Sequence, residues 1–500
     1  MQCNRITFPI ACRRWPVRVL LIAAAALSAC WGCSHETPDS DENPALPFEG
    51  VSLKLLVIGD PDLAAAARNR AGDWLARTGS TVEVLEATGP EDVIAKDDHP
   101  IAFDAVIYPE PLLGPLAEQG RLAPLSPEQL QTESLQWNRV LPLIRDHAVA
   151  WGDQVAAVPF GSRILVCFCR ADLLAEINRK PPTTWDEYQE IAELLADAGK
   201  RKSPDAPFYG TMEPLGPGWA ATTFLARAAS LAKHPSNYST LFHKDSMEPM
   251  INRPPFVKAL EQLVQAAKSG PPRQLESAPQ EVYRSFLSGR CGMALAWPDS
   301  NVVSELGSQE DEPPASMICA EVPGSREVFD LGRDEWTPRE EGESIHVALL
   351  GVEGRLGSVS KDSDHPKAAF RLLVSLAGTE WGNQIRPASQ ATAPCREASG
   401  IASGFRKRFP NSESARQHAD VLEAALSRPD WLFALRIPGR ERYLNALDDA
   451  VRQAAREEVA PQAALDSVAL QWQAITEELG AEDQQQAYKR SLELSRFPAK

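Results

Sequence analysis

The chain has 500 residues, with 51 lysines and arginines against 68 aspartates and glutamates, so its net charge is −17. This length allows two or three domains with a substantial core. The acidic balance argues against nucleic acid as a partner, because a phosphate backbone requires a basic surface. Nine cysteines are too few for a disulfide scaffold at this length, and none has the spacing of a zinc site. We therefore expect no metal and no cofactor.

Residues 1–29 have the pattern of a cleaved signal peptide. Arg13 and Arg14 precede an apolar run, 17–27, that is too short to span a bilayer core of ~30 Å. The run ends in Leu27-Ser28-Ala29-Cys30, which resembles the lipobox of bacterial lipoproteins. The resemblance implies cleavage before Cys30 and attachment of a diacylglycerol to its sulfur. The alternative is an ordinary cleaved signal followed by a chance cysteine.

A lipid on Cys30 would hold the chain outside the cytoplasm, tethered to the periplasmic side of a membrane. Removal of 1–29 would leave 471 residues and take away four arginines and no acid, so the net charge would be −21. Residues 30–50 are mostly polar and acidic and contain three prolines, which predicts a flexible tether.

The folded body is expected to begin with a buried strand at 53–59. Asp60-Pro61 then opens a predicted helix whose buried face includes Leu63, Trp74 and Leu75. Strands are expected at 81–85 and 103–108. Short apolar strands that alternate with helices are typical of an α/β layer with a parallel sheet.

The remaining elements follow the same alternation. Two strands are expected within 155–169, joined at 159–163, and Cys167 and Cys169 share one face there. Further helices are predicted at 184–198, 219–233, 256–268, 280–288 and 366–377, and further strands at 292–296, 317–322 and 345–350. Whether Cys291 and Cys319 form a disulfide is left open.

Two helices carry specific local signals. Thr184 with Glu187 forms a capping box, which makes Trp185 a structural residue at the helix start. In 461–479, apolar residues recur at spacings of three and four and predict a packing face. They are Leu465, Val468, Trp472, Ile475 and Leu479.

Several segments in the same order carry a family resemblance. They are FDAVIYP at 103–109, GRLAPL at 120–125, VPFGSR at 158–163, CRADLL at 169–174 with PPTTWDEY at 181–188, FLSGRCGMA at 286–294 and HPKAAFRLL at 365–373. Together they resemble the bacterial extracellular solute-binding proteins of family 1, which serve sugar-importing ABC transporters. The resemblance covers roughly 51–390.

The resemblance implies an α/β, two-lobed periplasmic-binding-protein fold (type II-like) with interleaved lobes and a hinged cleft. Crossings between lobes are expected at about 158–163, 288–292 and 345–351. The expected parts are 51–157 with 290–344 for the first lobe, 158–289 with 345–400 for the second, and 401–500 for a helical region packed on the lobes.

Two tryptophans are the expected aromatic contacts of a sugar. Trp297 ends a strand, before Pro298 and Asp299, at a place where the family often has an aromatic residue. Trp219 starts a helix, and the backbone N–H groups there could hold a polar ligand group. The alternative for each is a tryptophan of the core.

Polar candidates lie at strand ends and crossings. Asp60, Tyr108 and Glu110 follow the carboxyl ends of strands, where α/β sheets bind ligands. Ser162 and Arg163 lie at the proposed hinge, where the arginine could contact ligand or form a salt bridge between lobes.

Arg355 borders the third expected crossing, and its alternative is a solvated loop arginine. Enzyme motifs are missing from the sequence: it has no nucleophile elbow, no metalloprotease helix and no phosphate loop. We therefore predict no catalytic residues and a lipid-anchored receptor that delivers a small polar solute, above all a sugar, to an ABC-transporter permease. The alternatives are an extracytoplasmic sensor or adaptor with the same fold, and a lipid-anchored hydrolase.

Overall fold

The computed structural model describes residues 46–90, 101–202, 207–307, 316–397 and 403–494. The predicted signal peptide, Cys30 and most of the predicted tether lie outside these residues. The end of that tether belongs to the folded body, because Phe48 donates its backbone N–H to the Thr78 carbonyl at 2.8 Å and stacks on Trp74. Within the described stretches, no helix combines the length and apolarity that a membrane crossing requires.

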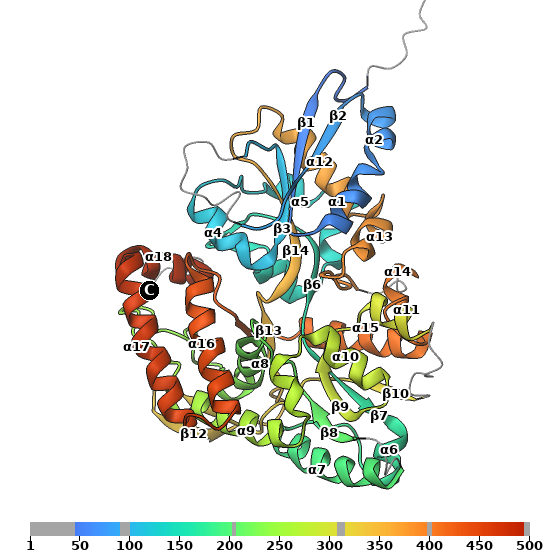
Figure 1. Cartoon of the computed structure of the whole chain (residues 1–500). Helices are drawn as coiled ribbons and strands as arrows, with labels where there is room; N and C mark the ends of the chain where they lie inside the picture. Colours follow the sequence, from blue (N-terminus) through green and yellow to red (C-terminus); the bar gives the residue numbers. More distant parts are fainter. Residues whose placement is uncertain (1–45, 91–100, 203–206, 308–315, 398–402, 495–500) are drawn as a thin grey trace, which may run out of the picture. The chain divides into compact units, whose positions relative to one another are not determined.

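One lobe is built on a five-stranded sheet with the order β2-β1-β3-β14-β6 (Figure 1). β14 runs antiparallel to both of its neighbours, while β1 pairs in parallel with β2 and β3. The strands are β1 (Ser52–Ile58), β2 (Thr81–Ala87), β3 (Ala105–Pro109), β6 (Val158–Arg163) and β14 (Glu353–Val359). α12 (Pro366–Ala377) packs its apolar face against this sheet.

The helix expected after Asp60 is two helices, α1 (Pro61–Arg68) and α2 (Ala71–Thr78). Leu63 and Trp74 are buried as predicted, but Leu75 is 45% exposed. The prediction for Leu75 is wrong because the break between the helices changes the face that each one turns to the sheet.

β14 occupies a stretch to which the sequence analysis assigned no helix or strand. Its glycines interrupt the apolar pattern by which a strand is recognised in a sequence, yet the packing around the strand requires them. A Cβ on Gly357 would lie 2.7 Å from the Phe160 ring and 2.9 Å from Leu373, and one on Gly354 would lie 2.7 Å from the Glu110 carboxylate. The strand therefore passes where its neighbours leave no room for larger residues.

The other lobe is built on a four-stranded sheet with the order β10-β7-β9-β8. Its strands are β7 (Val166–Arg170), β8 (Tyr209–Met212), β9 (Cys291–Ala296) and β10 (Met317–Glu321). Its helices are α7 (Trp185–Lys202), α8 (Ala220–Ala232), α9 (Pro254–Lys268) and α10 (Pro279–Leu287). All five cysteines in the described residues are free and buried, including Cys291 and Cys319.

The strand pairing corrects the expected division into lobes. β9 pairs with β7 and β8, so 291–296 belongs to the second sheet and not to the first lobe. β14 belongs to the first sheet and not to the second lobe. The expected crossing at 288–292 is absent because only three residues join α10 to β9, which pack on one another.

The chain crosses between the sheets at two short connections. One joins β6 to β7 at 164–165, just after the predicted 158–163, which itself forms β6. The other joins β13 (Ala348–Leu350) to β14 at 351–352, next to the predicted 345–351. After α12 the chain returns to the second sheet, where α15 (Ser412–Leu426) packs on β10.

The predicted capping box at α7 is confirmed. The Glu187 backbone N–H donates to Thr184 Oγ1 at 3.2 Å, and the Thr184 N–H donates to Glu187 Oε2 at 3.4 Å. Trp185 is buried, with the Arg227 guanidinium 4.0 Å from its ring centroid. Trp185 is therefore a structural residue, as expected.

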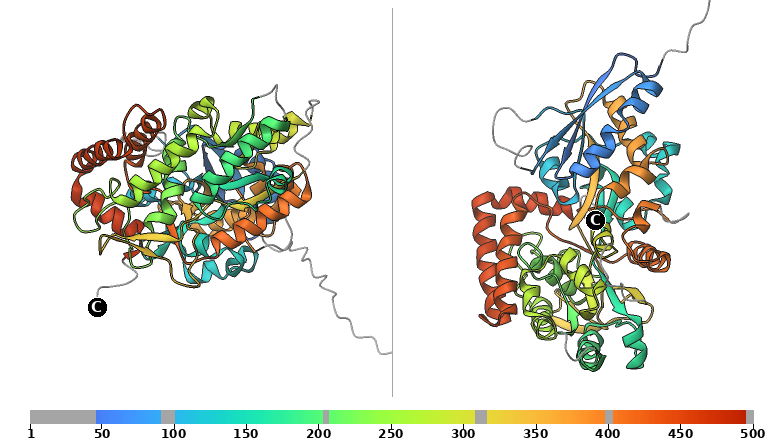
Figure 2. Two further views of the ribbon diagram at one scale, coloured as in Figure 1. Left: turned by 90° about the horizontal axis from the view of Figure 1, so that it is seen from below. Right: turned by 45° about the vertical axis from the view of Figure 1, so that its right-hand side comes forward.

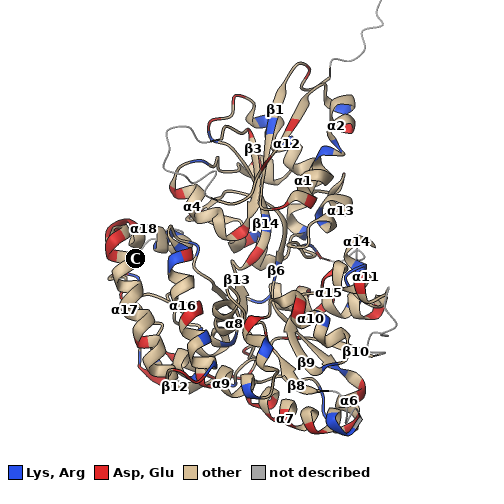
Figure 3. Ribbon diagram, in the orientation of Figure 1, with Lys and Arg blue, Asp and Glu red and all other residues tan. Residues whose placement is uncertain are grey.

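The C-terminal region contains β15 (Trp431–Phe433), which pairs with β13, and the helices α16 (Arg440–Ala455), α17 (Pro461–Leu479) and α18 (Ala481–Ser491). α16 and α17 pack on α9, and α16 also packs on α8 (Figure 2). The predicted packing face of α17 is confirmed, since only Leu479 of its five residues is not fully buried. Acidic and basic residues are interspersed over both lobes (Figure 3).

Candidate functional site

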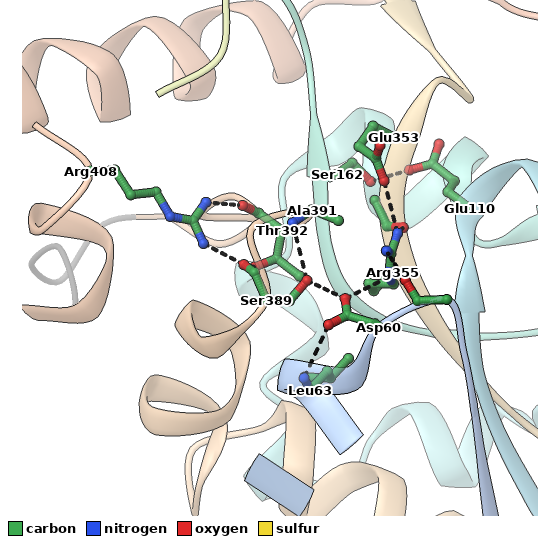
Figure 4. A network of polar contacts seen from close by, with 12 residues as sticks. Asp60, Leu63, Glu110, Ser162, Glu353, Arg355, Ser389, Ala391, Thr392 and Arg408 are labelled. Atoms are coloured by element: carbon green, nitrogen blue, oxygen red, sulfur yellow. Dashed lines mark hydrogen bonds and ion pairs between the residues drawn. The ribbon is translucent and has the colours of Figure 1, made fainter. Parts of the chain in front are cut away.

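Asp60 and Arg355, 295 positions apart in sequence, meet at the carboxyl end of β1, which β3 separates from β14 in the sheet (Figure 4). Asp60 Oδ1 accepts the Leu63 backbone N–H at 3.0 Å and so caps α1. Asp60 Oδ2 accepts from Arg355 Nε at 2.8 Å and from the Ser389 hydroxyl. Arg355 also pairs with Glu353 at 2.8 Å. Arg355 is thus a buried strand residue, and the alternative of a solvated loop arginine is wrong.

Glu110 links the end of β3 to both crossings. Its Oε2 accepts from the Ser162 hydroxyl at 2.5 Å, and its Oε1 accepts from the Gly351 N–H at 3.0 Å. The side chain is fully buried, and this burial raises the pKa of Glu110 to about 7, against the opposing effects of Ser162 and Arg436. Near neutral pH the carboxyl group is therefore divided between its protonated and ionised forms.

Arg163 connects the two lobes at the end of β6. Its Nη2 donates to the Pro298 carbonyl at 3.2 Å, and its guanidinium lies 4.6 Å from the Trp297 ring centroid. Burial lowers the pKa of Arg163 to about 10. Among the residues described, it forms no ion pair, so its contact across the lobes is a hydrogen bond and a cation–π interaction and not a salt bridge.

Trp219 and Trp297 lie together, with ring centroids 5.0 Å apart and an edge-to-face angle of 77°. Trp297 is only 2% exposed. Trp219 is half-buried beside exposed Pro217 and Gly218. In this arrangement Trp219 is therefore the more accessible of the two aromatic surfaces.

The N-terminus of α8 already has a partner from within the chain. The backbone N–H groups of Gly218 and Ala221 donate to the two carboxylate oxygens of Asp448, each at 3.0 Å. Asp448 belongs to α16 and is buried, although the Asp448-Asp449 pair looks like part of a solvated helix face in the sequence. These two N–H groups are consequently not free to hold a ligand group here.

Two other candidates have structural partners. Asp299 Oδ1 accepts the backbone N–H groups of Asn301 at 2.8 Å and Val302 at 3.2 Å and so caps α11 (Ser300–Leu306). Tyr108 is fully buried, and its hydroxyl lies 2.8 Å from Ser358 Oγ. In this structure Tyr108 is a core residue.

Ser389 and Arg408 also join this site, although nothing in the sequence singled them out. Arg408 is 2% exposed and donates to the carbonyls of Ser389 and Thr392 (Figure 4). They lie beyond or at the very end of the family-like segments, so no motif pointed to them. A cavity beside Arg163, Trp297 and Arg408 measures about 10 Å³. That volume is about one water molecule, so a sugar does not fit there in this arrangement.

Comparison with known proteins gives a consistent result. The family model described as bacterial extracellular solute-binding protein matches residues 78–383. A search of curated proteins found no match.

Many solved structures share the fold. An ABC transporter solute-binding protein from Agrobacterium radiobacter K84, in complex with ribitol, has a TM-score of 0.60 at 19% identity over 86% of this chain and 100% of its own. The sugar-binding protein MalE from Xanthomonas citri has a TM-score of 0.63 at 17% identity over 86% and 98%. Maltose-bound MalE3 from T. maritima has a TM-score of 0.58 at 16% identity over 85% and 100%. These similarities confirm the predicted two-lobed α/β fold.

Proposed function

The chain belongs to the bacterial extracellular solute-binding protein family, and from this premise we propose that it captures a sugar or polyol between its lobes for an ABC importer. The observation that carries the proposal is the meeting of polar and aromatic residues from both sheets at the crossings, where Arg163 contacts Pro298 and Trp297. The ligands of similar structures, ribitol and maltose, are of the same chemical class.

We propose that Trp219 offers its ring to the apolar face of the solute, with Trp297 supporting it from behind. Asp60, Glu110 and Arg355 would supply hydrogen bonds from the first lobe. Ser162, Arg163 and Asp299 would lie at the boundary between the lobes. Since most of these side chains are buried in the present arrangement, entry of the solute requires the lobes to move apart.

The proposed mechanism is a shift of population between separated and closed lobes. A solute that contacts both lobes stabilises the closed form by its differential affinity for the two forms. No chemical step is required of the chain. We further propose that Cys30 carries the lipid and that the receptor works outside the cytoplasmic membrane.

Thermal melting of the full chain in detergent, with a panel of sugars and polyols, tests this function. We expect one class of solute to raise Tm by mass action, and Trp219→Ala to abolish that rise because the accessible stacking surface is lost. Trp336→Ala is the matched control, since Trp336 is also half-buried and packs on the same core cluster. If a protein partner raises Tm while no sugar or polyol does, the chain is a sensor or adaptor.

A further inference from the structure

A small cavity of about 10 Å³ lies where the first crossing meets the C-terminal region. Its polar lining comes from four separate parts of the chain: Arg163 at the end of β6, Trp297 after β9, Arg408 just before α15, and His418 within α15. The rest of the lining is apolar, with Phe405 and Leu422 among it. Four side chains that carry nitrogen therefore line the cavity, among mostly apolar residues.

Two of these N–H groups lack an acceptor. Trp297 Nε1 and Arg408 Nε are both buried and have no hydrogen-bond partner in the part of the chain that the structure describes. Both side chains are 2% exposed, so neither group reaches bulk water. A buried donor without an acceptor loses its hydration without compensation, which native structures rarely tolerate.

The charges around the cavity are also unbalanced. Neither Arg163 nor Arg408 forms an ion pair with a carboxylate among the described residues. The nearby acids have other partners: Glu353 pairs with Arg355, Asp299 caps α11, and Asp60 binds Arg355 and Ser389. Burial and the charge of Arg163 lower the pKa of Arg408 to about 9.

His418, the fourth of these side chains, adds no charge to the cavity. Burial, followed by the charges of Arg408 and Arg163, lowers the pKa of His418 to about 3, so its ring is neutral at physiological pH. The cavity is thus lined by two cationic side chains and a tryptophan, and no carboxylate of the described residues forms an ion pair with either arginine.

We infer that this cavity binds one small monatomic anion of halide size, such as chloride, which accepts hydrogen bonds from Trp297 Nε1 and Arg408 Nε. Arg163 adds electrostatic attraction. The volume excludes polyatomic oxyanions such as sulfate, because it is no larger than about one water molecule. The inference does not depend on which solute the receptor captures.

The position of the anion gives it a structural consequence. It would contact the end of β6 from the first sheet, the residue after β9 from the second, and the segment before α15. An anion at this point stabilises the arrangement in which the three parts meet. Halide should therefore stabilise the chain more than a bulky monoanion does at the same ionic strength.

The test compares Tm of the full chain in sodium chloride and in sodium methanesulfonate, each raised from 1 to 100 mM. We expect chloride to raise Tm by about 1–2 °C more than methanesulfonate, for millimolar affinity. Trp297→Phe keeps an aromatic ring but removes the N–H. In this variant chloride should raise Tm no more than methanesulfonate does. Arg406→Gln, on the exposed side of the same segment, should keep the larger rise in chloride.

Equal Tm values in the two salts, or a full chloride effect in Trp297→Phe, would overturn the inference. A second measurement locates the ion without any variant. Crystals grown in sodium bromide should show an anomalous peak within hydrogen-bonding distance of Trp297 Nε1 and Arg408 Nε. Density at that point without anomalous signal identifies a water molecule and also overturns the inference.

Discussion

Glu110 is an acid whose ionisation opposes folding. Its carboxyl group is fully buried, and the burial raises its pKa from 4.5 to about 7. Between these values the unfolded chain has lost the proton and the folded chain still holds it. The free energy of unfolding therefore falls as pH rises from about 4.5 to 7, and the contribution levels off above that window.

Glu110→Gln should remove this dependence, because the amide mimics the protonated acid and does not titrate. Urea unfolding at pH 5 and pH 8 measures the effect. Between pH 5 and pH 8 we expect the free energy of unfolding of the wild type to fall by up to about 3 kcal/mol more than that of the variant. Glu83→Gln, on the exposed side of β2, is the control and should keep the wild-type slope. An unchanged slope in Glu110→Gln contradicts the assigned burial.

At the scale of residues, the sequence identified most members of the site but not their partners. Asp60, Glu110 and Arg355 were found from their places at strand ends and a crossing. The contacts between them could not be predicted, because Asp60 and Arg355 meet only once β1 and β14 lie in one sheet. Trp297 was expected to face a ligand, but its ring is buried and packs on both Arg163 and Trp219.

At the scale of elements, a residue of α16 caps the N-terminus of α8. The Asp448 carboxylate binds two N–H groups at the N-terminus of α8, where the helix dipole also favours a negative charge. The capping residue thus comes from a helix more than 200 positions away in sequence. This contact joins the C-terminal helices to the second lobe.

Asp448→Ala should destabilise the chain by roughly 1–2 kcal/mol, the usual cost of losing a cap and leaving buried N–H groups unpaired. Asp448→Asn should lose less, since its amide oxygen can still accept one of the bonds. Asp449→Ala is the matched control, because its neighbouring side chain is exposed. Urea unfolding at pH 8 measures all three, and equal effects of the two alanine variants would refute the capping role.

Most helices and strands were predictable from periodicity and caps, and their places in the two sheets were not. α12 has the predicted bounds, and β9 and β10 agree within one residue at each end. β14 was missed because Gly354 and Gly357, required by close packing, break the apolar pattern of a strand. β9 was assigned to the wrong lobe because a short, fully buried apolar strand has the same sequence pattern whichever of the two sheets it joins.

At the scale of the whole body, the C-terminal helices touch both lobes. α16 packs on α8 and α9 of the second lobe. Arg490 of α18 pairs with Glu118 of the first lobe, donating from Nε to Oε1 at 2.6 Å, and Trp151 donates to the same oxygen at 2.6 Å. Any separation of the lobes must therefore move or break this contact, and it must also bend the two short crossings and the return segment after α12.

Lobe closure over a captured solute is the central claim, and a distance between the lobes tests it directly. Spin labels at Glu128→Cys in the first lobe and Glu193→Cys in the second occupy exposed positions, while the five cysteines in the described residues are buried. Double electron–electron resonance on the full chain should show a distance distribution that narrows and shortens with a sugar or polyol that raises Tm. The same distribution with and without every member of the panel would contradict the claim.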